Sequence, residues 1–175
     1  MAKFKVAPVV GSPDIRAQLA DLLVETVANG GSVSFMHPLD AVQANAFWDG
    51  ALAAAARGER IVFGAFDGAA LVGTVTLLLD CPPNQPHRAE IAKMMTKVDR
   101  RGQGVATALL AAAERAALER GRTLLTLDTA VDGGASALYE KMGFTLSGII
   151  PDYALLPQGG LTGTMVYWKR IGVVQ

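Results

Sequence analysis

A glycine-rich turn between a strand and a helix, within residues 94–107, constrains the fold of this chain more than any other segment. The run Met-Met-Thr-Lys-Val-Asp-Arg-Arg-Gly-Gln-Gly-Val-Ala-Thr predicts a strand, a sharp turn and a helix that begins at once. The first N–H groups of such a helix have no partner within it, and its dipole makes that end positive. Gly102 and Gly104 allow the main chain to approach an anion closely. We therefore expect a site for an anion such as pyrophosphate, with Arg100 and Arg101 at its rim.

Two other phosphate-binding motifs do not fit this segment. A P-loop requires GxxxxGK[ST], and no Lys-Ser or Lys-Thr pair follows these glycines. A Rossmann fingerprint requires GxGxxG in the first β-α unit and an acidic residue about twenty positions later. Here the unit comes late in the chain, and Gly-Gln-Gly is followed by Val-Ala-Thr. A glycine turn that binds no ligand remains the structural alternative.

Hydrophobic periodicity and turn residues divide the whole chain into strands and helices. The expected strands cover Phe4–Val10, Arg60–Phe66, Ala69–Leu79, His87–Val98, Thr123–Thr129, Phe144–Ile150 and Thr162–Arg170. The expected helices cover Pro13 to about Val27, Pro38–Arg57, Val105–Arg120 and Gly133–Met142. The order β-α-α-β-β-β-α-β-α-β-β predicts an α/β fold of mixed α+β type. We expect one domain over residues 1–175, with a twisted mixed sheet of about seven strands and helices on both faces.

The amino-acid composition argues against several classes of binding partner and site. The 175 residues carry 16 basic and 16 acidic side chains, so long-range charge favours neither nucleic acid nor an anionic membrane. One cysteine, Cys81, excludes an internal disulfide, and with only two distant histidines we expect no metal site. No apolar run is long enough for a signal peptide or a membrane span, so we expect a cytoplasmic protein.

Two motifs in this order resemble those of the GNAT superfamily of N-acetyltransferases. The signature R/Q-x-x-G-x-G/A is found as Arg101-Gly102-Gln103-Gly104-Val105-Ala106, after a strand that ends in Met94-Met95-Thr96. A second motif follows as Leu138-Tyr139-Glu140-Lys141-Met142-Gly143-Phe144. Further segments look like the tabtoxin-resistance acetyltransferases, namely Leu23–Val27, Gly30–Met36, Arg88–Glu90, Leu127–Thr129 and Pro151–Tyr153.

The resemblance implies that acetyl-CoA binds where the fourth and fifth strands splay apart, with its pantetheine between them. The main chain of Met94, Met95 and Thr96 would pair with pantetheine. The N–H of Met94 or Met95 would face the thioester carbonyl, where a donor stabilises developing negative charge. The pyrophosphate would lie against the main chain of Gly102, Gln103, Gly104, Val105, Ala106 and Thr107. Relatives often have asparagine near position 132, and Asp132 here puts that pantetheine contact in doubt.

An amine must lose its proton before it can attack a thioester, because an alkyl ammonium, with a pKa of about 10, has no lone pair. Glu90 and Asp128, on the strands beside the gap, are the candidate bases, directly or through one water, and both remain open. Tyr139 is the candidate acid for the departing thiolate. The structural alternatives are a solvent-facing carboxylate for Glu90 and packing against the sheet for Tyr139. For Asp128, within Leu-Leu-Thr-Leu-Asp-Thr, burial without function would be costly.

Two loops should line the acceptor side, because long loops held by a rigid scaffold often carry binding residues. The candidates, from residues 29–37 and 151–160, are Ser32, Ser34, Phe35, Met36, Asp152 and Tyr153. Trp48 could close this pocket, and a position in the core is the alternative.

These residues favour transfer of acetyl from acetyl-CoA to a primary amine of a small molecule, such as an amino-acid-like toxin, an antibiotic or a metabolite. Cys81 lacks an evident activating base, so we expect direct transfer in a ternary complex. Acetylation of protein N-termini or lysines, a non-catalytic acyl-CoA sensor and an ATP-binding domain are the alternatives. The late strands could also mediate a homodimer.

Overall fold

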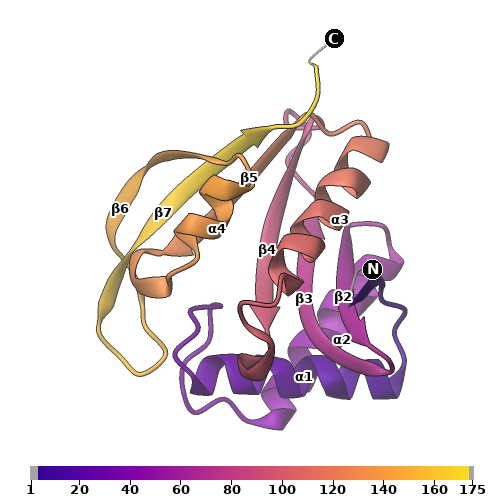
Figure 1. The fold of residues 1–175 in the computed structure, drawn as a ribbon, viewed down its shortest axis with the longest axis vertical. Helices are drawn as coiled ribbons and strands as arrows, with labels where there is room; N and C mark the ends of the chain where they lie inside the picture. The colour runs from indigo at the N-terminus through magenta and orange to yellow at the C-terminus, as the bar shows by residue number, and fades with distance from the viewer. Residues whose placement is uncertain (1–3, 174–175) are drawn as a thin grey trace.

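The computed structural model describes residues 4–173 (Figure 1). The strands in this range are β1 (Lys5–Pro8), β2 (Arg60–Asp67), β3 (Ala70–Leu78), β4 (Arg88–Thr96), β5 (Leu124–Ala130), β6 (Thr145–Leu155) and β7 (Leu161–Arg170). The helices are α1 (Pro13–Ala28), α2 (Ala41–Ala56), α3 (Val105–Glu119) and α4 (Ser136–Lys141), with short 3-10 turns η1 (Val98–Arg100) and η2 (Val131–Gly133). The strands form one sheet in the order β1-β2-β3-β4-β5-β7-β6. Its pairs are antiparallel except for β4 with β5, which confirms the predicted mixed sheet of seven strands.

Side-chain caps fix where the first two helices begin. The Ser12 hydroxyl accepts a hydrogen bond from the Ile15 N–H at 3.2 Å, as its place before a first-turn proline predicts. The Asp40 carboxylate accepts one from the Gln43 N–H at 2.7 Å, so α2 begins at Ala41 rather than at Pro38. The predicted start was three residues too early because a proline is favoured in a first turn but does not itself cap a helix.

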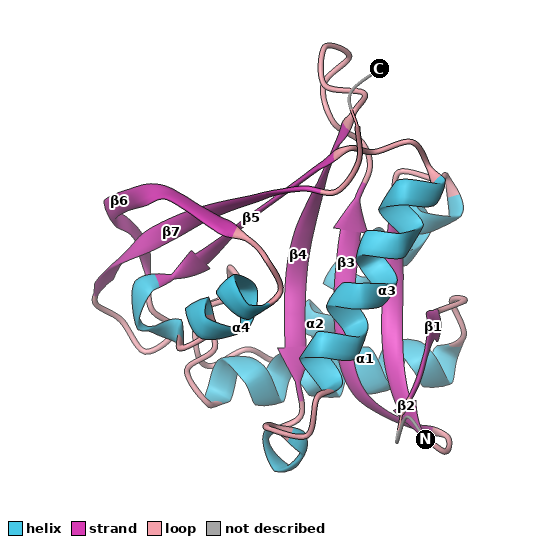
Figure 2. Cartoon of the chain, turned by 45° about the horizontal axis from the view of Figure 1, so that its top comes forward, coloured by secondary structure: helices cyan, strands magenta, loops and turns pink. Residues whose placement is uncertain are grey.

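Helices cover both faces of the sheet, and the strands alternate their side chains between two cores. In Figure 2, α3 lies in front of β3, while α1 and α2 lie behind it. On β2, Val62 packs into the core under α1 and α2, whereas the next residue, Phe63, packs into the core under α3. Trp48 is fully buried in the first of these cores, so its structural alternative is correct.

The two parallel strands pair over only a short distance and then diverge. Their register joins Arg88–Glu90 of β4 to Leu124–Thr126 of β5, and no further pair follows in the described chain. Beyond this point β5 pairs with β7 on its other side. Figure 2 shows β4 and β5 separating from a common end, with α4 beside the gap. The predicted splay of the fourth and fifth strands is thus confirmed.

The last hairpin differs from its prediction. We expected a strand over 144–150 and a loop over 151–160, whereas β6 continues to Leu155. Residues 151–153 bulge out between the pairs Ile150–Thr164 and Ala154–Thr162, and Asp152 has a φ of 51°. Because a proline cannot donate to a strand ladder, Pro151 marks a bulge here and not the end of the strand. Helix α4 is also shorter than predicted and begins at Ser136 after a left-handed Gly134.

Strand β6 lies at the edge of the sheet and is exposed along nearly its whole length. Large apolar side chains stand on it at the surface, including Ile149, Ile150 and Tyr153, each about half exposed. A homodimer through the late strands would cover them, and this stays a prediction. Among the described residues, no helix combines the length and the apolar character that a membrane crossing requires.

Candidate functional site

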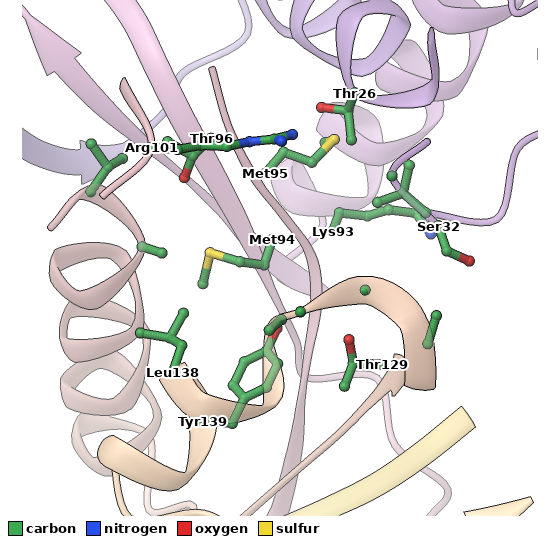
Figure 3. Close-up of a pocket in the computed structure, with 18 of the residues that line it drawn as sticks. Thr26, Ser32, Lys93, Met94, Met95, Thr96, Arg101, Thr129, Leu138 and Tyr139 are labelled. Atoms are coloured by element: carbon green, nitrogen blue, oxygen red, sulfur yellow. The ribbon is translucent and has the colours of Figure 1, made fainter. Parts of the chain in front are cut away.

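A cavity of about 750 Å³ opens where β4 and β5 part. Its wall comes from the end of α1 and the loop after it, from β4, from the start of α3, from the end of β5 and from η2 and α4. Figure 3 shows side chains from these elements converging on this space. The sequence-predicted residues that line it are Ser32, Ser34, Met94, Met95, Thr96, Arg100, Arg101, Gly102, Gly104, Val105, Ala106, Thr107, Asp128, Asp132 and Tyr139. The splay therefore brings into one cavity residues from distant parts of the sequence.

The start of α3 has the backbone that an anion site requires. Gly102 and Gly104 have φ angles of 72° and 85°, a left-handed backbone conformation that residues with a Cβ rarely adopt. A Cβ at either glycine would meet no atom within 4 Å, so the space in front of both is open. The first helical bond runs from the Ala108 N–H to the Gly104 carbonyl at 3.1 Å, which leaves the three preceding N–H groups without helical acceptors.

The two arginines beside this turn differ in their partners. The Arg100 guanidinium donates to the Asp67 carboxylate, at the end of β2, at 2.8 Å, so the positive charge of Arg100 is largely balanced. Arg101 is exposed, and its guanidinium has no hydrogen bond or ion pair within the described chain. Of the two, Arg101 is the better placed to meet a bound phosphate.

A bulge in β4 forms the middle of the cavity wall. The pairs Thr74–Met95 and Thr76–Ala92 leave two β4 residues, Lys93 and Met94, opposite one residue of β3. Because pairing with β5 ends at Glu90, the main chain beyond it faces the gap without a strand partner. Figure 3 shows Met94 pointing toward Leu138 and Tyr139 on α4, while Lys93 extends the opposite way.

Asp128 lies on β5 and reaches the cavity. The alternation of β5 places Leu125 and Leu127 in the core and turns Asp128 to the other side, where it is exposed. The Thr164 hydroxyl donates to its carboxylate at 2.9 Å and so holds it in place. The burial suggested by its apolar sequence neighbours does not occur, because neighbouring strand residues face opposite sides.

Tyr139 approaches the same space from α4. It is 5% exposed, and its ring packs against those of Phe144 and Tyr167, with centroids 5.9 and 6.0 Å away. Burial, and after it the charge of Asp128, raises the pKa of Tyr139 to about 12. The phenol is therefore protonated at neutral pH and able to donate a proton or a hydrogen bond.

Six predicted residues do not line the cavity. Glu90 stands at the last β4–β5 pair, below the opening, and its carboxylate pairs with Arg88 at 3.2 Å. Asp152 and Tyr153 belong to the exposed bulge of β6, because that strand is longer than expected. The others are Gln103, Phe35 and Met36.

Lys93 is the main cavity residue that the sequence interpretation did not single out. Its φ of 51° and its place in the bulge turn it into the cavity, where the Nζ donates to the Ser34 hydroxyl at 3.0 Å. Burial lowers the pKa of Lys93, while Asp128 and Glu90 raise it. A lysine in a strand normally predicts a solvated face, so the only sequence signal was its position beside Met94. Thr26, Thr129 and Lys141 also line the cavity and were not predicted.

The profile of the Acetyltransferase (GNAT) family matches residues 25–144, which include the α3 turn, the bulge and α4. This chain belongs to the GNAT acetyltransferase family. Acetyl-CoA is the acetyl donor that GNAT acetyltransferases use, and the protein is an N-acetyltransferase that depends on it.

Solved structures share this GNAT fold over nearly their whole length. A Salmonella typhimurium protein solved with its cofactor acetyl-CoA has 13% identity and a TM-score of 0.78, covering 97% of this chain and 95% of that one. A ribosomal-protein-alanine N-acetyltransferase from Brucella melitensis has 18% identity and a TM-score of 0.78, covering 95% and 99%. An aminoglycoside 6′-N-acetyltransferase complexed with coenzyme A has 19% identity and a TM-score of 0.75, covering 98% and 99%.

Proposed function

We propose that this GNAT enzyme transfers acetyl from acetyl-CoA directly to a primary amine of a small molecule, within a ternary complex. One observation carries the proposal. A single cavity joins the open amino end of α3, the unpaired edge of β4, the carboxylate of Asp128 and the phenol of Tyr139. Direct transfer needs a donor site, a base and an acid around one reacting atom, and the cavity offers a candidate for each.

The donor would bind along the α3 side of the cavity. The open N–H groups of residues 105–107 and the exposed Arg101 suit a pyrophosphate. The unpaired edge of β4 at Met94 to Thr96 suits the amides of pantetheine, and a main-chain N–H of the bulge suits the thioester oxygen. When bound, acetyl-CoA supplies an activated acyl carbon.

Asp128 would accept the proton of the acceptor ammonium, directly or through one water, so that a neutral amine attacks the acyl carbon. The carboxylate faces the cavity and is oriented by Thr164, as a base should be. Tyr139 would give its phenolic proton to the sulfur as the carbon–sulfur bond breaks, and the proton that the acylated nitrogen loses would restore the phenol. Glu90 is the weaker of the two candidate bases, because it is paired with Arg88 and lies outside the cavity lining.

The two loops of the acceptor side favour a small acceptor. The His37 N–H donates to the Pro157 carbonyl at 2.8 Å, and the Gln158 amide donates to the Val27 and Ala28 carbonyls, each at 3.3 Å. These bonds hold the end of α1 and the loop after it against the turn between β6 and β7. An extended peptide would need an open groove between these loops. A protein acceptor, as in the ribosomal-protein enzyme from Brucella melitensis, is the alternative.

The narrower likeness to tabtoxin-resistance acetyltransferases would make the acceptor an amino-acid-like toxin and the role one of resistance, in the cytoplasm. It is supported by Asp128 within Leu127–Thr129 and by the cavity position of Ser32 and Ser34 within Gly30–Met36. A sensor without catalysis would not require an oriented carboxylate and a protonated phenol in the same cavity.

Thiol release from acetyl-CoA against amino acids, polyamines and antibiotics tests the proposal. We expect turnover with at least one free amine and none with its N-acetyl derivative. Tight acetyl-CoA binding without thiol release for any small amine would overturn small-molecule transfer. Release with N-terminal peptides alone would establish the protein alternative.

A further inference from the structure

Lys93 is a cation in the acceptor half of the cavity without a carboxylate in contact with it. None of the ion pairs among the described residues includes it. Its Nζ donates to the Ser34 hydroxyl and lies 5.7 Å from the ring centre of Phe47 and 6.0 Å from that of Phe35. An ammonium has three donors, and these contacts use one of them in a hydrogen bond.

The backbone holds this lysine in an unusual conformation. A non-glycine residue with a φ of 51° is uncommon, and such residues gather at functional sites. The bulge sends Lys93 toward the loop after α1, while Met94 beside it points to α4 (Figure 3). The ammonium therefore stands on the opposite side of β4 from the α4 residues Leu138 and Tyr139.

A partly buried ammonium without a contacting anion is costly, and a ligand that carries one would relieve that cost. Burial already lowers the pKa of Lys93, while Asp128 and Glu90 act on it through space. Two opposite charges, Lys93 and Asp128, thus line one cavity. An acceptor with both a cationic amine and an anionic group matches this pair, with the amine at Asp128.

We propose that Lys93 binds a carboxylate of the acceptor, so that the enzyme prefers amines that carry an acidic group on the same small molecule. This inference rests on the proposed function and narrows its substrate class. Lys93 acts here as a specificity residue: it places the acceptor and takes no part in the proton transfers. The ammonium and Ser34 would share the carboxylate oxygens, as charge-assisted hydrogen bonds favour.

Matched pairs of an acid and its carboxamide test this role by acetyl-CoA thiol release. The probes are ω-amino acids from glycine to 6-aminohexanoate and α-amino acids such as methionine, each beside its amide. Rates are compared at equal concentrations of the neutral amine. Aminomethylphosphonate and taurine separate a carboxylate from other oxyanions. We expect the best acid to exceed its amide at least about tenfold in kcat/KM, which corresponds to one charge-assisted contact.

The variants Lys93→Met and Lys93→Arg locate the preference. Lys93→Met should raise KM for the acid about tenfold and bring the acid-to-amide ratio near one, with the kcat for the amide and the acetyl-CoA affinity retained. Lys93→Arg, which keeps the charge, should retain most of the preference. Amides that react as well as acids in the wild type would overturn the inference and leave the proposed function standing. So would an unchanged ratio in Lys93→Met. Absence of turnover with every amine would overturn both.

Discussion

The proposed donor side and the proposed acceptor side of the cavity are built in different ways. On the donor side the main chain forms the site, through left-handed glycines, an open helix end and an unpaired strand edge. On the proposed acceptor side the cavity is lined by the side chains of Lys93, Ser34 and Asp128, which come from β4, a loop and β5. Backbone sites tolerate most changes that keep the local conformation, whereas the acceptor side can change with single side chains. If the two sides have these roles, the fold could keep the same acetyl donor while changes of single side chains alter the acceptor.

A charge placed in the donor site should have the largest effect. Gly104→Glu puts a carboxylate at the open helix end, and we expect acetyl-CoA affinity to fall on the order of 1,000-fold, about 4 kcal/mol. Gly104→Gln has nearly the same size and the same left-handed strain without the charge. Isothermal titration of both variants separates the two effects. An equal loss in both variants would show that side-chain size and backbone strain cause the loss and that the added charge does not.

Removal of the candidate base should be the next largest effect. Asp128→Asn keeps an oxygen that can accept from Thr164, so the local structure is retained. We expect kcat to fall about 100-fold while the acetyl-CoA affinity stays near that of the wild type.

The matched variant is Glu90→Gln, which changes the other carboxylate in the same way. Since Glu90 pairs with Arg88 outside the cavity lining, its kcat should change less than about threefold. A larger loss in Glu90→Gln than in Asp128→Asn would reverse the assignment of the base.

The sequence predicts the main-chain part of the cavity better than the side-chain part. The turn at 102–107 could be predicted because glycine acts locally: its φ angles depend on residues next to it in the chain. The splay was implied by family resemblance. Lys93 could not be predicted, since its direction depends on a bulge against β3, which strand patterns do not encode. The same limit explains why Asp152 and Tyr153 were wrongly predicted to lie in a loop. They lie in β6, whose extent depends on pairing with β7.

Tyr139 stands between the two sides and should have a smaller effect on the rate. Tyr139→Phe keeps the ring packing on Phe144 and removes the proton donor. We expect kcat to fall about tenfold, with little change in the KM of either substrate, in steady-state assays. An unchanged kcat would leave Tyr139 as a packing residue.

The pH dependence of stability gives an independent measure of the environment of Tyr139. A folded pKa of about 12, against an unfolded value near 10, means that the folded state holds this proton more tightly. The contribution of Tyr139 to the free energy of unfolding is fully present below pH 10. It falls by roughly 3 kcal/mol as the pH rises toward 12. Urea unfolding should therefore show a shallower alkaline decline in Tyr139→Phe. Parallel curves would mean that the phenol is solvated.

The smallest expected effect is a change in the thermal stability of the fold when Lys93 is replaced. Burial lowers its folded pKa below the unfolded value, so the charged form is less favourable in the folded state. Lys93→Met removes that cost and loses the bond to Ser34, which is exposed and can turn to water. We expect the melting temperature to rise by about 2–4 °C at pH 7, equivalent to about 1 kcal/mol. Above the ordinary lysine pKa, the Lys93 side chain is neutral in both the folded and the unfolded wild-type protein. The difference in melting temperature between the wild type and Lys93→Met should therefore vanish near about pH 11. If Lys93→Met is instead less stable than the wild type at pH 7, then Lys93 stabilises the fold. In that case its position would not be evidence that the acceptor side is adapted to a ligand.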